Sequence, residues 1–284
     1  MVKRYTKIFL IVFIVSAVGF VFACSQDYLG LLRSTDLSER MAVRDSFPFL
    51  DGEKEGGTPR DYRNKTFGTS YKFIVLTDTH IEDGKTFGLE GLGSVIISEN
   101  IDFVVIAGDI TQTGSLQEIQ KFIEVADDFD VPVYPVVGNH DFYFDNWPVW
   151  KDYIGSTRHR IDFDETSLFI LDSANSFFGK EQLDWLENEI NSITNADQRV
   201  FVFTHSPLFI PFKMQQIIDT KERARITSIL RNRCDIMFMG HSHVRVENTI
   251  GNVRYVSIED FVNTKVYCIV TVDGSDVSYE FRKL

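Results

Sequence analysis

The sequence VPVYPVVGNHD, residues 131–141, joins a short apolar run to a polar loop. A run of four to eight apolar residues bounded by turn residues is typical of a buried strand. Gly138 suits the tight turn that must follow such a strand. The next three residues are Asn139, His140 and Asp141, so an amide, an imidazole and a carboxylate stand together. We expect side chains that carry chemistry at the end of this strand.

Four further apolar runs end in the same way, so that five of the six histidines follow a predicted strand. The runs and their polar successors are 73–76 before Asp78 and His80, 104–107 before Gly108 and Asp109, 200–203 before His205, and 236–239 before Gly240, His241 and His243. Residues two apart in an extended backbone point the same way, so each Asp-x-His or His-x-His pair is predicted to face one site. Mixed nitrogen and oxygen ligands favour Mn, Fe or Zn over Ca or Mg.

The order of elements predicts the fold class. The apolar runs alternate with helix-like segments at 115–129, 180–191 and 215–231, and this β-α-β rhythm favours a parallel sheet with helices on both faces. The tail from Val244 to Arg282 is predicted to form several strands linked by turns at 251–252 and 273–274. We therefore expect an α/β fold, a two-sheet sandwich flanked by helices, and the 25 Phe residues predict a large aromatic interior.

The five motifs together resemble the signature of the calcineurin-like metallophosphoesterases, although a lone His-x-His is more often structural or surface decoration. That signature is Asp-x-His, Gly-Asp, Gly-Asn-His-Asp, a later His and Gly-His-x-His, and here it runs from Asp78 to His243. The resemblance implies the fold of that family and hydrolysis of phosphoesters by in-line attack of a metal-activated hydroxide. Two divalent transition metal ions, Mn, Fe or Zn, are implied as cofactors.

The resemblance also assigns the site residues. The first metal would be bound by Asp78, His80 and His243, the second by Asn139, His205 and His241, and Asp109 would bridge the two. His140 corresponds to the proton donor or leaving-group stabiliser, and Asp141 would orient it. His159 lies outside every motif, and we interpret it as structural.

Departures from other branches of the family favour phosphodiesters, with phosphomonoesters as the alternative. The stretch 108–114 lacks the arginine that clamps phosphate in phosphoprotein phosphatases, and Gln112 stands where purple acid phosphatases have a tyrosine. The sequence then resembles the bacterial group that includes class III cyclic-nucleotide phosphodiesterases and glycerophosphodiesterases. Arg158 and Arg160 could still reach a phosphate in the fold. Aromatic residues between Phe142 and Tyr153 are expected to pack in the core rather than to hold a base or lipid chain.

The alternative from another class is a catalytically silent, lipid-anchored binding protein, which the complete ligand set argues against. The expected partner is a small-molecule or lipid phosphoester. A net charge of −12 argues against broad nucleic-acid binding, so no nucleic-acid scaffold is expected.

The first residues have the layout of an export signal. Basic residues in 1–7 precede an almost purely apolar run from Ile8 to Ala23, and residues 21–24, VFAC, resemble a lipobox that ends at Cys24. We expect an exported lipoprotein, periplasmic or at the cell surface and associated with the membrane. An uncleaved anchor and simple secretion are the alternatives. The predicted organisation is 1–23 signal peptide or anchor, 24–69 linker and 70–284 metallophosphoesterase domain. Cys234 and Cys268 are either buried thiols or a disulfide pair.

Overall fold

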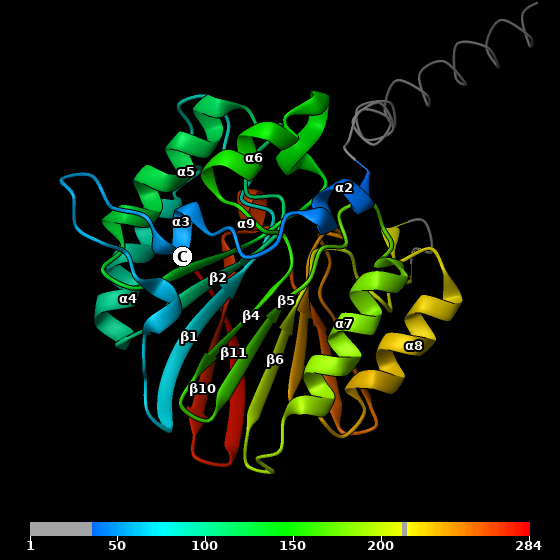
Figure 1. Cartoon of the computed structure of the whole chain (residues 1–284). Helices are drawn as coiled ribbons and strands as arrows, with labels where there is room; N and C mark the ends of the chain where they lie inside the picture. The colour runs from blue at the N-terminus through cyan, green and yellow to red at the C-terminus, as the bar shows by residue number, and fades with distance from the viewer. Residues whose placement is uncertain (1–35, 212–214) are drawn as a thin grey trace, which may run out of the picture.

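The computed structural model, which describes residues 36–211 and 215–284, contains two β-sheets packed face to face with helices outside them (Figure 1). The predicted α/β sandwich is therefore confirmed. Within the described part of the chain, no helix combines the length and the apolar character needed to cross a membrane.

The first sheet has the order β11-β10-β1-β2-β3. Its strands are β1 (Ser70–Leu76), β2 (Phe103–Ala107), β3 (Val133–Val136), β10 (Val266–Asp273) and β11 (Asp276–Lys283). β1, β2 and β3 are parallel, whereas β10 and β11 add an antiparallel hairpin. The carboxyl ends of the three parallel strands therefore meet at one edge of the sheet.

The second sheet has the order β4-β5-β6-β7-β9-β8. Its strands are β4 (His159–Phe163), β5 (Thr166–Ile170), β6 (Arg199–Phe203), β7 (Ile236–Met239), β8 (Val246–Ile250) and β9 (Val253–Ser257). β5, β6, β7 and β9 are parallel, and β4 and β8 are antiparallel edge strands. The predicted strands are thus present, and β4 is one that the sequence pattern did not reveal.

Alternation along β6 shows how the layers are held together. Val200 and Val202 face outward into a cluster with α7 and α8, whereas Phe201 and Phe203 face inward toward the first sheet. The inner layer is rich in aromatic rings, as the phenylalanine content predicts. Phe73 stacks on Phe103 at 4.5 Å between ring centroids and meets Phe201 edge-on at 5.1 Å.

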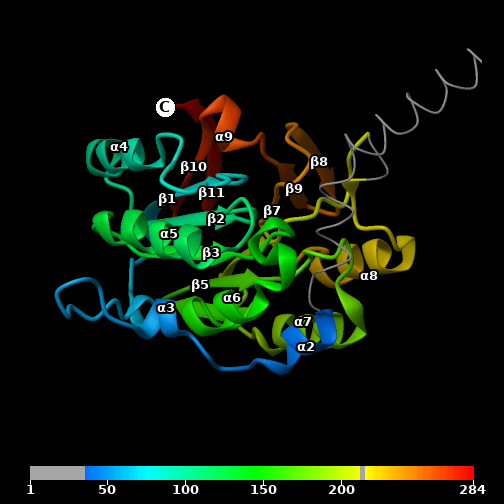
Figure 2. The same cartoon turned by 90° about the horizontal axis from the view of Figure 1, so that it is seen from above.

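In the described part of the chain, the longer helices lie outside the two sheets. α7 (Gly179–Ser192) and α8 (Thr220–Leu230) pack on the second sheet. The buried apolar side chains of α4 (Leu92–Glu99) and α5 (Leu116–Asp128) belong to the same core cluster as those of the first sheet. Figure 2 shows α4 and α7 on opposite sides of the molecule. The prediction of helices on both faces of one sheet was wrong, because each inner face is occupied by the other sheet.

The segment predicted as a linker packs against the domain from Asp36 onward. It forms α2 (Leu37–Ala42), α3 (Pro48–Asp51) and the 3₁₀ turn η1 (Tyr62–Asn64). Phe49, Leu50 and Tyr62 belong to the main core. The linker interpretation was therefore wrong for residues 36–69, because single apolar side chains without a period can still reach the core. Residues 1–23 and Cys24 lie outside the described residues.

Two remaining sequence expectations concern His159 and the cysteines. His159 begins β4, is buried, and meets Phe47 edge-on at 5.2 Å. Burial lowers the pKa of His159 to about 4. Cys234 and Cys268 are buried free thiols.

Candidate metal centre

Five loops converge at the carboxyl ends of β1, β2, β3, β6 and β7, near the short helix α9 (Phe261–Thr264). Backbone hydrogen bonds fix these loops against one another. The amide N–H of Asp78 donates to the carbonyl of Gly108, and that of His80 donates to the carbonyl of Asp109, both at 3.0 Å. The N–H of Gly240 donates to the carbonyl of His205 at 2.8 Å. The motifs that follow the five predicted strands therefore lie together in the structure.

The backbone of these loops is not extended, contrary to the sequence prediction. Asp78, His80, His241 and His243 have φ values of 54°, 45°, 66° and 55°, and Asp109 has 47°. Such left-handed conformations are uncommon for residues other than glycine and cluster at functional sites. The side chains converge because each loop turns sharply after its strand, not because alternate residues of a strand share a face.

Two glycines let the loops approach closely. Gly108 has φ +92°, and a Cβ placed there would lie 2.3 Å from Nδ1 of His205. A Cβ on Gly138 would lie 2.2 Å from Oδ1 of Asp109. A side chain at either position would displace a predicted metal ligand.

Asp109 lies at the centre of the site. Its Oδ2 is 3.1 Å from Nε2 of His205, 3.9 Å from Nε2 of His80 and 4.0 Å from Nε2 of His140. Its Oδ1 accepts a hydrogen bond from the N–H of His140 at 2.9 Å. One buried carboxylate therefore faces imidazoles from both predicted metal sites, as a bridging ligand must.

The predicted ligands form overlapping groups whose donor atoms lie within 4.8 Å of one another: Asp78, His80 and His243; Asp109, His205 and His241; and His80, Asp109 and His140. The first group matches the first predicted metal site, and the second matches the second site apart from Asn139. His243 is 43% exposed, whereas Asp78 is fully buried. The site is therefore open to solvent on the His243 side.

In the absence of metal, the charges of the buried carboxylates Asp78 and Asp109 are offset by protons on the imidazoles that face them. Burial alone would raise the pKa of Asp78, but the hydrogen bond from His243 and the charge of His205 lower it to about 2. Burial would lower the pKa of His205, yet the charge of Asp109 and its hydrogen bond raise it to about 9. The pKa of His80 is lowered, chiefly by burial, which favours the neutral imidazole that binds metals. A divalent cation would replace the protons on these imidazoles.

Several buried polar atoms fit a bound metal. Neither ring nitrogen of His80 has a hydrogen-bond partner among the described residues, and neither has Oδ1 of Asn139. Burying such atoms without a partner costs about 1–3 kcal/mol each. One imidazole nitrogen of His80 and the amide oxygen of Asn139 are suitable donors for Mn, Fe or Zn. The donor set therefore fits the ions that the sequence predicts.

His140 and Asp141 face different partners. Nδ1 of His140 lies 2.8 Å from the carbonyl oxygen of Gln112. The carboxylate of Asp141 accepts hydrogen bonds from the N–H and hydroxyl of Thr111 and from the N–H of Gly138. Burial, together with the charge of Asp109, raises the pKa of Asp141 to about 7. Asp141 thus joins the loops after β2 and β3.

Most of the aromatic side chains after this motif are buried. Phe142, Tyr143, Trp147 and Trp150 are at most 3% exposed, whereas Phe144 is 49% exposed. Packing in the core, the expected role, applies to the buried four. Tyr143 also contacts the site through its hydroxyl, and the sequence pattern gave no signal of that contact.

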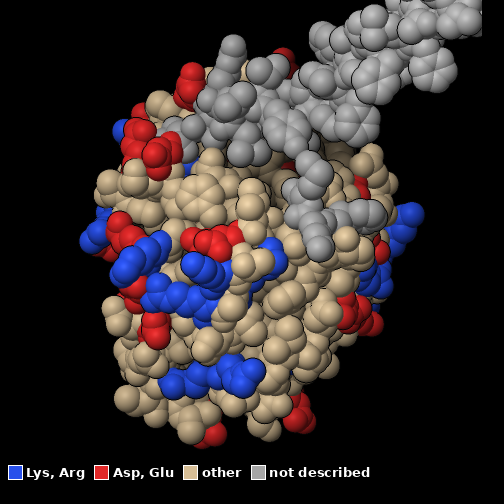
Figure 3. All heavy atoms as spheres, turned by 90° about the vertical axis from the view of Figure 1, so that its right-hand side faces the viewer, with Lys and Arg blue, Asp and Glu red and all other residues tan. Residues whose placement is uncertain are grey.

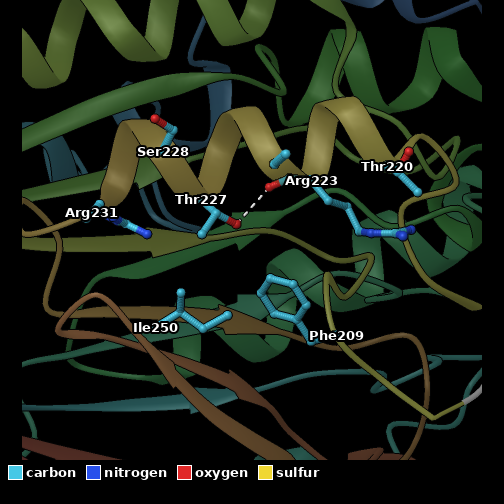
Figure 4. Close-up of a pocket in the computed structure, with 8 residues that line it drawn as sticks. Phe209, Thr220, Arg223, Thr227, Ser228, Arg231 and Ile250 are labelled. Carbon is cyan, nitrogen blue, oxygen red and sulfur yellow. Dashed lines mark hydrogen bonds between the residues drawn. The ribbon is translucent and has the colours of Figure 1, made fainter.

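A groove of about 540 Å³ lies elsewhere, between α8 on one side and β8 with the loop at Phe209 on the other (Figure 4). Arg223 and Thr227 of α8, and Arg231 directly after it, line one side, and Phe209 and Ile250 lie opposite. The nine predicted site residues are not among the described residues that line it. The side of the molecule on which α8 lies in Figure 1 is mostly uncharged where it is coloured, with several basic side chains beside acidic ones (Figure 3).

Comparisons with known proteins agree with this geometry. A family model described as "Calcineurin-like phosphoesterase" matches residues 71–245, which is more than half of the chain. A protein of Fibrobacter succinogenes, named a probable cyclic nucleotide phosphodiesterase, is 29% identical over 188 residues, covering 60% of this chain and 71% of the relative. A probable glycerophosphodiester phosphodiesterase of Arcobacter nitrofigilis is 28% identical over 167 residues, covering 53% of this chain and 59% of the relative. The match thus spans less than two thirds of the second relative.

Solved structures share the fold. A purple acid phosphatase from yellow lupin has a TM-score of 0.62 at 15% identity, covering 77% of this chain and 52% of that structure. A dimetal phosphatase from Danio rerio has a TM-score of 0.56 at 16% identity, covering 74% of this chain and 98% of that structure.

Proposed function

Because the chain belongs to the calcineurin-like phosphoesterases and is a phosphoester hydrolase, we propose that it hydrolyses phosphodiesters with two divalent transition metal ions. The observation that carries the metal assignment is the Asp109 carboxylate. It faces His80 on one side and His205 on the other. Asp78 and His243 complete the first site, and Asn139 and His241 complete the second.

The bound ions would polarise the phosphoryl group and lower the pKa of an attacking water. The remaining chemistry belongs to the protein. A carbonyl oxygen can only accept, so the 2.8 Å contact with Gln112 places the proton of His140 on Nδ1. Nε2, which faces Asp109, is then the atom that, when the ring is protonated to the imidazolium, gives its proton to the leaving oxygen. Asp141 supports this arrangement through its hydrogen bonds with Thr111 and Gly138, which join the loop of His140 to the loop after β2.

The positions of the nearby arginines support diesters. A monoester dianion is best served by an extra cationic clamp. Arg158, however, lies over the ring of Trp185 at 5.0 Å, and Arg160 pairs with Asp162 and Glu189. These contacts tie both side chains to the α7 side of the fold, so neither supplies the clamp.

Arg245, two residues beyond His243, is also engaged, through two hydrogen bonds to Glu259 at 2.8 and 3.0 Å. A diester carries one charge less than a monoester and depends less on such a clamp. The names of the two curated relatives, both probable phosphodiesterases, point the same way.

The test compares bis(4-nitrophenyl) phosphate with 4-nitrophenyl phosphate at one pH and one concentration of Mn²⁺. We expect a higher kcat/KM on the diester. The Arg158→Ala variant serves as a control, since an arginine engaged with Trp185 should affect neither rate by more than about twofold. A clear monoester preference, lost in the Arg158→Ala variant, would overturn the diester proposal.

We further propose that the chain is exported and lipidated at Cys24, with an uncleaved anchor as the alternative. The support is the basic start, the apolar run and the small residue at Ala23. Intact mass after expression in a bacterial host tests the proposal, with Cys24→Ser as control. A mass that retains residues 1–23 would favour the anchor, and cleavage elsewhere without lipid would favour simple secretion.

A further inference from the structure

The buried Tyr143 is a hydrogen-bond partner of the predicted metal ligand Asn139. The side-chain amide of Asn139 donates from Nδ2 to the hydroxyl oxygen of Tyr143 at 2.6 Å. The amide oxygen therefore points the other way, and it is buried without a hydrogen-bond partner among the described residues. An amide can bind a cation through oxygen but not through its NH₂ group. In this orientation the NH₂ group is engaged by the hydroxyl, and the oxygen is left for a cation.

The backbone around Tyr143 departs from regular helical geometry. The 3₁₀ segment η3 (His140–Asp145) is interrupted by non-helical residues, and Phe144 has φ +56°. A bulky residue in the left-handed region is an outlier that persists only where the surroundings hold it, often at functional sites. The interruption brings Tyr143 into the core at 3% exposure, while Phe144 turns outward.

Tyr143 also touches the other functional residue of the same loop. Its ring lies 4.3 Å from the imidazole of His140, measured between centroids. The N–H of His140 in turn donates to Asp109, which both predicted metal sites share. A single buried ring therefore supports a ligand, the proton-donor residue and the loop that joins them.

We propose that Tyr143 is a positioning residue that holds the Asn139 carboxamide with its oxygen toward the second metal site. The inference rests on the metal sites of the proposed function and adds a residue that the ligand motif does not contain. Outer partners of ligands typically change metal affinity or activity by about 10–100-fold. The hydroxyl should therefore matter to one of the two metal-binding steps and not to the other.

The Tyr143→Phe variant removes only the hydroxyl oxygen. Calorimetric titration of the metal-free protein with Mn²⁺ should show two binding steps in the wild type. In Tyr143→Phe, one step should weaken about 10–100-fold, and the other should stay within about twofold. Tyr134→Phe is the matched control, because Tyr134 is also buried and its hydroxyl donates to the carbonyl of Tyr62 at 2.9 Å. Both steps should be unchanged in that control.

A rescue separates positioning from general packing. Aspartate at position 139 has two equivalent oxygens and needs no orientation. In the Asn139→Asp background, Tyr143→Phe should therefore weaken the sensitive Mn²⁺-binding step by less than about threefold, because the outer partner no longer has an orientation to hold. Three results would overturn the inference: an equal loss of Mn²⁺ affinity in both backgrounds, a loss of affinity in both binding steps together, or no loss of affinity in either step. A wild type with no Mn²⁺-binding steps would instead overturn the proposed metal sites themselves.

Discussion

Replacing Gly108 with alanine should disable the site through a single methyl group. The new Cβ would stand 2.3 Å from Nδ1 and 2.5 Å from Cγ of His205, whereas ordinary contacts are 3.4 Å or longer. The imidazole must therefore move by about 1 Å, a displacement that can cost about a hundredfold in rate. The φ of +92° adds about 1–2 kcal/mol of backbone strain for an L-residue.

Gly56→Ala is the matched control for this experiment. Gly56 has φ +93°, and a Cβ there would meet nothing within 4 Å, so this variant carries the backbone strain without the clash. Both variants should lower the melting temperature by about 2–4 °C per kcal/mol. Only Gly108→Ala should lose about a hundredfold in kcat/KM and bind less metal, as measured by nitrophenol release and by metal analysis. Equal activity and metal content in the two variants would refute the placement of His205 as a ligand.

Three further predictions concern Asp109, His140 and His159, with Gln112→Ala as a control for the first. Asp109→Asn should abolish activity and reduce metal content, because it removes the charge of the shared carboxylate. Gln112→Ala should change activity little, since Gln112 contacts His140 through its backbone carbonyl. Near wild-type turnover in Asp109→Asn would remove the two-metal assignment. His140→Ala should retain both metals but lose about a hundredfold or more in kcat; a collapse in metal content would make His140 a ligand instead. In the wild type, the pKa of His159 is lowered from 6.5 to about 4 in the folded state, so the unfolded chain takes up the proton first as the pH falls. The wild type should therefore lose about 2 kcal/mol of unfolding free energy between pH 7.5 and pH 5 through this group. The His159→Phe variant should lack that loss. Urea unfolding at both pH values measures this, and an equal loss in wild type and variant would contradict it.

The sequence predicted the strands that are buried on both faces, because such strands are continuous apolar runs. β2 and β6 lie where those runs placed them. β4 was not predicted, because it mixes His159, Arg160 and Asp162 with apolar residues, as an edge strand does. The packing of residues 36–69 was missed for a related reason. Contacts such as that between Arg40 and Asp172, which are 132 positions apart in the chain, leave no local pattern.

The candidate site was predicted in its composition but not in its geometry. Each ligand follows an apolar run, so its place at a strand end could be inferred from the sequence. The left-handed backbone of Asp78 and His80 could not, because residues other than glycine adopt that conformation only uncommonly and the surrounding loops decide where they do. The partners of Asp141 and the contact between Asn139 and Tyr143 also depend on how the loops meet in space.

The central claim is that this chain hydrolyses phosphodiesters only when metal occupies the cluster around Asp109. The most direct test removes all metal by chelation and then measures hydrolysis of bis(4-nitrophenyl) phosphate while Mn²⁺ is added back to the metal-free protein. We expect the metal-free protein to be inactive and activity to rise until about two ions are bound per chain, the number that fits the two ligand groups sharing Asp109. Full activity in the metal-free protein, or saturation without any bound metal, would contradict it.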